Sequence, residues 1–269
     1  MSTIEKALGL LEHFSSQSPE IGLSDFKRLT AFDKGTTHRY LTALKECGFL
    51  EQNPTTKAYR LGPAIIRLAA VRESTVPLRS TVAIHVDRIA TEIRELVHAS
   101  VPQSSGMSML YALDGGISGT RVALDEAEVL PFHATSSGIA QLAFGSVSMR
   151  EKVLAKRIKS FTERTPASRE DVEALIEKAR ARGAAIADGS YEADVCSVAV
   201  PFFDNSACAI GTIAVATPSA RMTPEMRQNI TSILIQNSQH LTQSLGGTVP
   251  ADLRDLWTSD EAFEKARPR

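Results

Sequence analysis

Residues 21–62 constrain the fold more than any other part of the chain, because the spacing of their apolar residues changes at a single glycine, Gly48. Before this glycine, buried-type residues recur at steps of three and four, which is typical of a helix with one buried face: Thr37, Tyr40, Leu41, Leu44 and Cys47. After it, residues 49–51 and 58–61 alternate in character around an Asn53-Pro54 turn, as the strands of a hairpin do. The pattern predicts a helix that stops at Gly48, where a left-handed backbone suits glycine, followed by a two-stranded wing.

A shorter helix is predicted just before this one. Ser24 is placed to cap a helix over residues 25–30, in which Phe26 and Leu29 lie three residues apart. A turn at Phe32-Asp33 then separates the two helices. Two helices joined by a tight turn and followed by a hairpin are typical of a winged helix-turn-helix.

The exposed face of the second helix carries cations and short hydroxyls, the side chains that contact phosphates and base edges in a major groove. The candidate DNA-contacting residues of this helix are Lys34, Thr36, Thr37, His38, Arg39, Thr42 and Lys45. In the hairpin, Lys57 and Arg60 are expected to face a phosphate backbone. We rank Arg39 first for a base or phosphate contact, whereas His38 has an alternative role in helix packing.

Charge is informative only locally, because the whole chain has a net charge of −1 and a pI of about 6.6. Residues 27–60 contain seven Lys or Arg against three Asp or Glu, a local charge of +4. A basic helix face by itself is most often simply solvated. Together with the turn, the glycine stop and the basic hairpin, however, it favours double-stranded DNA as the partner.

The remaining composition fits a cytoplasmic protein with two ordinary domains. The chain has 269 residues, of which 43% are hydrophobic. Its start lacks the features of a signal peptide, and no run of about 18 apolar residues is present to span a membrane. Three cysteines without paired spacing, Cys47, Cys196 and Cys208, indicate neither a disulfide framework nor a zinc knuckle, and no cofactor is expected.

Residues that typically start or stop helices divide the chain into four predicted parts. The first part opens with an amphipathic helix over residues 1–15, in which Ser2 and Glu5 have the spacing of a capping box. This helix is expected to pack under the second helix of the helix-turn-helix, which carries the candidate DNA contacts. The predicted parts are a winged helix-turn-helix domain (1–62), a linker helix starting at Pro63 (63–76), a second domain starting at Pro77 (77–245) and a C-terminal tail (246–269). The tail either docks on a neighbour or is a frayed end with one local helix.

The second domain is predicted to have an α+β fold, because short apolar runs separated by turn residues are combined with helical segments. Strands are expected at 97–101, 107–113, 120–124, 195–203 and 208–217. Helices are expected from Leu78 to Leu96, at 138–144, 149–158 and 168–182 with a stop at Gly183, and from Thr223 to about Leu245.

Four ordered segments resemble the IclR family of bacterial transcription regulators. They are GTTHRYLTALKECGFLEQNPTTKAYRLGP, LPFHATSSGIAQLAF at 130–144, DVCSVAVPFFD at 194–204 and ATPSARMTPEM at 216–226. The resemblance extends to about Leu245. It implies an N-terminal winged helix, a linker helix and a C-terminal GAF-like effector domain, assembled as a homodimer or homotetramer. It also implies that the protein binds promoter DNA and responds to a small organic or aromatic acid. Repressors are more frequent than activators in the family, so a repressor is expected.

The second of these segments supplies a candidate effector site. Thr135, Ser136 and Ser137 sit just before the predicted helix that begins at Gly138, and the free backbone N–H groups of a helix start attract an anion such as a carboxylate. One of the hydroxyls is also suited to cap this helix, which is compatible with binding.

Four further candidate effector-binding residues come from the third family segment and the residues before it, where relatives that bind keto acids place polar groups: Asp188, Tyr191, Cys196 and Ser197. This chain departs from the family in having Ile139 where Lys is common, and in placing Cys196 one position early. Asp188 would repel a carboxylate unless it accepts a hydrogen bond from the effector, which favours a hydroxylated or zwitterionic ligand.

Three other classes of function were weighed. A catalytic Cys-His-acid set is conceivable from Cys196, His133 and Asp188. However, a thiol in a Val-rich strand is expected to be buried and inert, so no enzyme is predicted. A metal- or thiol-responsive regulator would have to use residues that lack close ligand spacing: His85, His98, His133 and the cysteines. A small-ligand-binding oligomer without DNA affinity is the remaining alternative.

Overall fold

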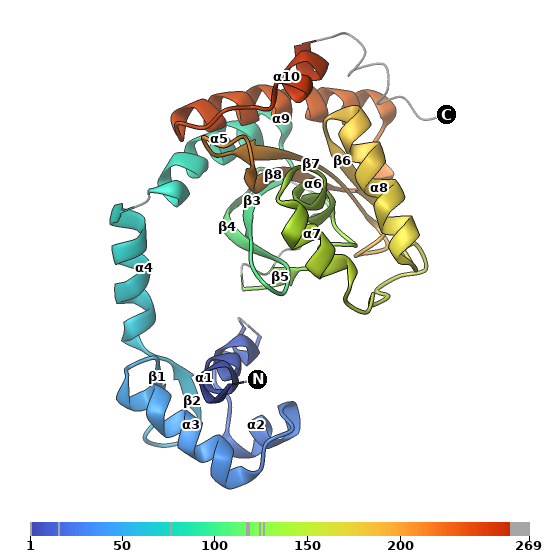
Figure 1. The fold of residues 1–269 in the computed structure, drawn as a ribbon. Helices are drawn as coiled ribbons and strands as arrows, with labels where there is room; N and C mark the ends of the chain where they lie inside the picture. The colour runs from blue at the N-terminus through green and yellow to red at the C-terminus, as the bar shows by residue number, and fades with distance from the viewer. Residues whose placement is uncertain are drawn as a thin grey trace. The chain divides into compact units, whose positions relative to one another are not determined.

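The computed structural model describes residues 2–15, 17–75, 77–116, 119–123, 125 and 127–258. The chain divides into two compact units, Met1–Pro77 and Leu78–Arg269 (Figure 1). Each unit has buried hydrophobic clusters of its own, so each is described by itself. The predicted linker helix belongs to the first unit, and the boundaries expected at residues 62 and 76 stay predictions.

The first unit is a winged helix-turn-helix. Its elements are α1 (Thr3–Leu8), the 3-10 helix η1 (Gly9–His13), α2 (Leu23–Leu29), α3 (Lys34–Glu46), β1 (Leu50–Gln52), β2 (Tyr59–Leu61) and α4 (Pro63–Thr75). β1 and β2 form the antiparallel wing, and Ile21 adds a bridge to Tyr59. Phe26, Leu41 and Leu50 are fully buried between the helices and the wing.

The longest helix of the helix-turn-helix has the limits that its local chemistry predicts. Asp33 caps α3, because its carboxylate accepts the backbone N–H of Thr36 at 2.9 Å. Gly48 follows the helix with φ at +75°, so the predicted glycine stop is confirmed. The predicted buried face is confirmed for Thr37, Tyr40, Leu41 and Leu44. Cys47 is exposed instead, because the helix ends there and the chain turns away.

Two predictions at the N-terminus need correction. The capping box of Ser2 and Glu5 is present, but the predicted helix over residues 1–15 changes at Gly9 to a 3-10 turn, at a residue with low helix propensity. α2 begins before Ser24, which therefore is not its cap. Gly22 holds the cap position, and its N–H donates to the Asp25 carboxylate at 3.3 Å.

The second unit is built on a six-stranded antiparallel sheet in the order β5-β4-β3-β8-β7-β6. Its strands are β3 (Leu96–Pro102), β4 (Met107–Asp114), β5 (Val129–Leu130), β6 (Ala185–Asp188), β7 (Val195–Phe203) and β8 (Ala209–Pro218). Its helices are α5 (Leu78–Ile93), α6 (Ser136–Phe144), α7 (Val147–Leu154), α8 (Arg169–Arg182), the 3-10 helix η2 (Ser219–Arg221), α9 (Pro224–Ser244) and α10 (Ala251–Thr258). This arrangement confirms the predicted α+β fold.

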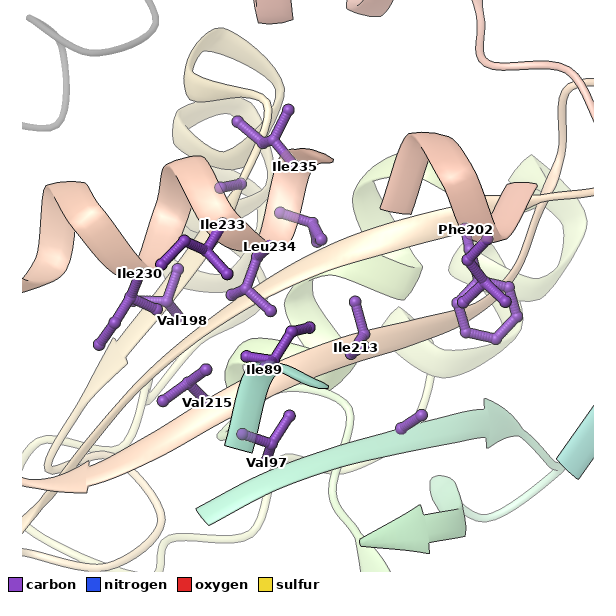
Figure 2. Packing of buried hydrophobic residues seen from close by; sticks show 14 of the residues in the cluster. Ile89, Val97, Val198, Phe202, Ile213, Val215, Ile230, Ile233, Leu234 and Ile235 are labelled. Atoms are coloured by element: carbon purple, nitrogen blue, oxygen red, sulfur yellow. The ribbon is translucent and has the colours of Figure 1, made fainter. Parts of the chain in front are cut away.

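Helices cover both faces of the sheet. On one face, α5 and α9 pack over the central strands, and Figure 2 shows Ile89 and Leu234 above Val97 and Val215. On the other face, α6 and α8 enclose a second apolar cluster that includes Ala199 of β7. Because side chains alternate along a strand, β7 and β8 are apolar on both faces and form the centre of the core.

Several predicted elements of the second unit have other limits in the structure, including the helix predicted at 138–144, which begins at Ser136, and two strands were missed. The helix that starts at Leu78 ends at Ile93, because Arg94 has a left-handed backbone (φ 58°), and Leu96 opens β3. Of the predicted strand 120–124, residues 120–123 have no regular structure, and residue 124 lies outside the described residues. The edge strands β5 and β6 were not predicted. The helix predicted at 149–158 begins earlier, at Val147 after the Ser146 cap, and ends at Leu154.

The described part of the C-terminal tail docks on its own chain. Trp257 and Leu253 of α10 are each only 4% exposed and join the core under α9. The indole Nε1 of Trp257 donates to the carbonyl oxygen of Gly183 at 2.9 Å, where α8 ends with a left-handed glycine. Residues 259–269 of the predicted tail lie outside the described residues. Among the helices that are described, none is long and apolar enough to cross a membrane.

Candidate functional site

The exposed side of α3 presents a stripe of polar side chains. Lys34, His38, Thr42 and Lys45 follow one another at steps of three or four, so they lie along one side of the helix. Arg39 is exposed beside them, with its guanidinium 5.5 Å from the ring centre of Tyr40. No ion pair within the described part of the chain involves the cations of this stripe. His38 is exposed and does not pack in the core, which leaves it available on the surface.

The two threonines at the start of α3 have structural roles. Thr37 is fully buried, and its hydroxyl donates to the carbonyl oxygen of Asp33 at 2.9 Å, so it faces the core and not the exposed stripe. Its assignment as a DNA contact was therefore wrong. The hydroxyl of Thr36 donates to the Asp33 carboxylate at 2.7 Å. Hydrogen bonds from the backbone and then the side chain of Thr36 hold the pKa of Asp33 below its usual value, so this cap is ionised.

The wing carries one unpaired cation and one paired cation. Its tip is shaped by Asn53, whose side-chain oxygen accepts the backbone N–H groups of two tip residues. Lys57 is exposed there, and none of the ion pairs of the described residues includes it. Arg60 forms ion pairs with Glu51 at 2.5 Å and Glu20 at 3.6 Å. Lys57 is therefore the better placed of the two for a phosphate.

A pocket opens in the second unit on the α6 side of the sheet. It holds about 500 Å³ of space not filled by atoms, counting its open mouth. Its floor is one face of β3, β7 and β8, which contributes His98, Ser197 and Ala216. The first turn of α6 and the segment around Tyr191 form its other walls. The predicted residues Thr135, Ser136, Ser137, Tyr191 and Ser197 thus meet in one place.

The first turn of α6, which lines this pocket, has free backbone donors. Thr135 caps the helix, since its hydroxyl oxygen accepts the N–H of Gly138 at 3.1 Å. Among the described residues, no acceptor is found for the backbone N–H of Ser136 or Ser137. Free N–H groups at a helix start carry partial positive charge and attract anions. The N–H of Gly138 is occupied, and a Cβ on Gly138 would lie 2.2 Å from the Phe132 carbonyl oxygen, so this glycine serves close packing.

The polar side chains near the start of α6 are uncharged at neutral pH. Ser136 donates to the Ser197 hydroxyl at 2.8 Å, and Ser137 lies 3.2 Å from Nε2 of His98. Burial lowers the pKa of the His98 imidazole from its usual 6.5 to about 4. Its Nδ1 is buried without a hydrogen-bond partner in the described structure. The pocket therefore offers hydroxyls and a neutral imidazole beside the helix start.

The opposite wall is acidic. The hydroxyl of Tyr191 donates to the carboxylate of Glu128. Burial, then the hydrogen bond to Glu128, raises the pKa of Tyr191. Burial, then the charge of Glu128, also raises the pKa of Glu192, which lines the pocket. A ligand in this pocket thus meets the N–H donors of the α6 start and the carboxylate of Glu192, whereas Glu128 does not line the pocket.

Two predicted pocket residues face the other side of the sheet. Asp188 and Cys196 are paired across β6 and β7, one residue away from the pocket-lining pair Ala187 and Ser197. Cys196 is buried in the cluster under α9, where burial and then the charge of Asp188 raise its pKa. The Asp188 carboxylate accepts a hydrogen bond from Ser219 at 3.2 Å and lies 3.5 Å from Arg164. Neither residue lines the effector pocket, which corrects both assignments.

The alternative sites considered from the sequence are not assembled in the structure. His133 lies within hydrogen-bond distance of the Lys159 carbonyl oxygen, on the α6 side of the sheet, whereas Cys196 lies on the α9 side. His85 contacts Asn237 and His98 contacts Ser137, in separate environments. Within the described ranges, no group of three or more His, Cys, Asp or Glu side chains is placed to hold a metal ion.

Sequence reasoning missed His98, Ser190 and Glu192 as pocket residues. His98 did have a signal, because it is the one ionisable residue in a mostly apolar strand. Ser190, whose hydroxyl donates to the Ala134 carbonyl oxygen at 2.9 Å, lies in a turn that no periodic pattern marks. These features define a class of protein: a DNA-binding winged helix combined, in one chain, with a small-molecule-binding α+β domain.

Comparison with known families agrees with this class. The model of the IclR helix-turn-helix domain matches residues 3–54, and that of the bacterial transcriptional regulator IclR C-terminal domain matches residues 72–243. The chain belongs to the IclR family and is a DNA-binding transcriptional regulator.

Individual relatives support the same assignment. The crystal structure of an IclR transcriptional regulator from Silicibacter sp. TM1040 is 37% identical, with a TM-score of 0.85 over 93% of this chain and 99% of that one. The glycerol operon regulatory protein of Streptomyces coelicolor is 26% identical over 249 residues, which span 91% of this chain and 97% of that protein. An IclR homolog from Microbacterium hydrocarbonoxydans, complexed with 4-hydroxybenzoate, is 25% identical with a TM-score of 0.72, over 91% and 99% of the two chains.

Proposed function

We propose that this protein is a cytoplasmic, ligand-responsive repressor whose operator affinity is changed by a small organic acid bound at the start of α6. The observation that carries the proposal is the pair of free backbone N–H groups at Ser136 and Ser137, two residues that line the pocket. Helix starts of this kind bind carboxylates and phosphates. The homologous regulators are not enzymes, and we extend this to the present chain.

The two ends of the pocket favour a hydroxylated aromatic acid. A carboxylate would accept hydrogen bonds from the N–H groups of Ser136 and Ser137. The His98 imidazole is neutral, so it adds no positive charge that would make the binding of the carboxylate irreversible. Away from the α6 start, Glu192 lines the pocket and is suited to accept a hydrogen bond from a ligand hydroxyl. The relative complexed with 4-hydroxybenzoate binds a molecule with both groups.

For DNA, we propose that α3 enters the major groove with its exposed stripe and that the wing follows the phosphate backbone. The contacting residues are Lys34, His38, Arg39, Thr42, Lys45 and Lys57, with Thr36 and Arg60 at the edges of this surface. A homodimer or homotetramer would present two such helices to a pseudopalindromic operator. Effector binding would then change their separation through α4, provided that the effector binds the two states unequally.

The DNA claim is tested by fluorescence anisotropy of the full chain on its own upstream promoter fragment and on scrambled DNA, across a salt series. We expect specific binding whose affinity falls steeply with salt. Arg39→Ala is expected to weaken binding by about 5- to 150-fold, which corresponds to ~1–3 kcal/mol for one base contact. Arg254→Ala, which removes an exposed arginine from α10 in the second unit, is the matched control and should leave affinity unchanged. If genome-wide selection recovers no preferred site, the DNA claim fails.

The pocket claim is tested by calorimetric titration with hydroxybenzoates, benzoate and the matching amides. Ser136 is the first residue of α6 and follows an extended Thr135, so proline fits there and removes the N–H without breaking the helix. Ser136→Pro is expected to abolish acid binding, whereas Ser136→Ala, which loses only the hydroxyl, should retain most of it. Amides that bind as well as their acids would contradict the anion site.

A further inference from the structure

A second cavity lies beside the effector pocket, and the Tyr191 side chain lines both. It holds about 1020 Å³ of space not filled by atoms, counting its open mouth. Buried Phe132, Leu154 and Val172 line its apolar part. The rest of its wall is the irregular loop 156–161 that follows α7. This cavity plays no part in the function proposed above.

Cations line this cavity and no acidic residue does. Lys156, Arg157 and Lys159 are all lining residues, whereas no Asp or Glu is. Across the described residues, none of the three takes part in an ion pair. The ammonium group of Lys156 donates to the Ser104 carbonyl oxygen at 2.7 Å, which fixes its position without neutralising its charge. Three uncompensated cations at one cavity favour a ligand with more than one negative charge.

An aromatic wall stands next to these cations. The rings of Phe161 and Tyr191 are 4.9 Å apart in an edge-to-face arrangement, and the His133 ring lies 5.8 Å from Phe161. The Lys159 ammonium group lies 5.0 Å from the centre of the Phe161 ring. Flat ligands stack on such rings, while their acidic groups reach the neighbouring cations.

The loop that carries this wall is held in place by hydrogen bonds. The hydroxyl of Thr162 donates to the Gly189 carbonyl oxygen at 2.6 Å, and that of Thr165 donates to the Ser190 carbonyl oxygen at 2.7 Å. The backbone N–H of Phe161 donates to the Thr165 hydroxyl at 3.0 Å. The wall is thus preorganised, which lowers the entropic cost of binding.

We propose that this second cavity is a separate binding site for a planar organic polycarboxylate, held by Arg157 and Lys159 against the Phe161 ring. The proposal does not depend on the ligand of the first pocket. Arg157 supplies the planar fork of donors that matches a carboxylate, and Lys159 supplies a second positive charge.

The test is calorimetric titration of the full chain with benzene-1,3,5-tricarboxylate, isophthalate, benzoate, phenyl phosphate and inorganic phosphate. We expect one site per chain for the tricarboxylate and isophthalate, with benzoate and inorganic phosphate at least about tenfold weaker. A preference for phenyl phosphate over both polycarboxylates would overturn the assigned ligand class. No saturable binding by any of these probes would overturn the site itself.

Matched variants locate the ligand. Arg157→Gln combined with Lys159→Gln should weaken binding about tenfold or more, because each charge-assisted hydrogen bond is lost. Lys152→Gln combined with Lys178→Gln removes the same number of exposed charges outside the cavity and should leave affinity unchanged. Ser136→Pro should also leave it unchanged, which separates this site from the effector pocket. Equal losses in both double variants, or loss in Ser136→Pro, would refute the proposal.

Discussion

His98 should make the second unit less stable in mild acid. Its pKa is about 4 in the folded chain, because burial disfavours the charged ring, against a usual 6.5 for an exposed histidine. Between these values the unfolded state binds a proton that the folded state does not, so the free energy of unfolding falls as the pH decreases from about 6.5 to about 4. The 2.5-unit difference between the two values corresponds to about 3 kcal/mol in all, and about 2 kcal/mol of this is lost between pH 7 and pH 5.

Urea unfolding followed by tryptophan emission measures this loss. Trp257 is the sole tryptophan and is buried in the second unit, so its signal reports that unit even if the two units unfold separately. Carboxylates contribute to acid sensitivity in every variant, so the informative quantity is the difference between the wild type and His98→Gln. We expect the variant to lose about 2 kcal/mol less than the wild type between pH 7 and pH 5. The same pH dependence in both proteins would refute a buried, neutral His98.

Three further substitutions test particular contacts. Gly183→Ala places a Cβ 2.4 Å from Trp257 Nε1 at a φ of +70°, so we expect a loss of ~1–3 kcal/mol and a red shift of tryptophan emission. Arg221→Ala leaves the buried Glu95 carboxylate without its two hydrogen bonds, at 2.8 and 2.7 Å, and should cost ~1–3 kcal/mol in urea unfolding. Thr135→Ala removes the α6 cap and should cost about 1 kcal/mol, whereas Thr135→Ser should cost little.

For each of these substitutions, one outcome would contradict the contact that it tests. Unchanged emission in Gly183→Ala would mean that α10 does not dock at the end of α8. Arg169→Ala removes an arginine from exposed ion pairs of the second unit and should be nearly neutral. A similar cost for Arg169→Ala and Arg221→Ala would mean that burial of Glu95 is unimportant. Equal costs for Thr135→Ala and Thr135→Ser would mean that the hydroxyl does not act as the cap.

The parts of the fold that depend on local hydrogen bonds were predictable from the sequence. The glycine stops at Gly48 and Gly183 and the capping box at Ser2 all depend on residues within one helical turn. Errors arose where two local patterns overlapped. Leu96 fits the helical spacing of α5, but the left-handed backbone at Arg94 ends the helix before it.

The candidate site was predictable only in part, because strand pairing determines which face a residue occupies. The residues around the start of α6 were found from a family segment together with the chemistry of a helix start. Ser197 and Cys196 are neighbours in one strand, yet only Ser197 reaches the pocket. The position of His98 under α6 depends on the pairing of β3 with β8, where His98 lies opposite Ala214. No short-range pattern reports such a contact between distant segments.

The most direct test of the account measures whether acid binding at the start of α6 controls DNA affinity. Anisotropy on the selected operator, titrated with hydroxybenzoates, would compare the wild type, Ser136→Ala and Ser136→Pro. We expect at least one acid to weaken operator binding by about 5- to 150-fold in the wild type and Ser136→Ala. Ser136→Pro should bind the operator normally and not respond to the acid. A response in Ser136→Pro equal to that of the wild type would contradict the account.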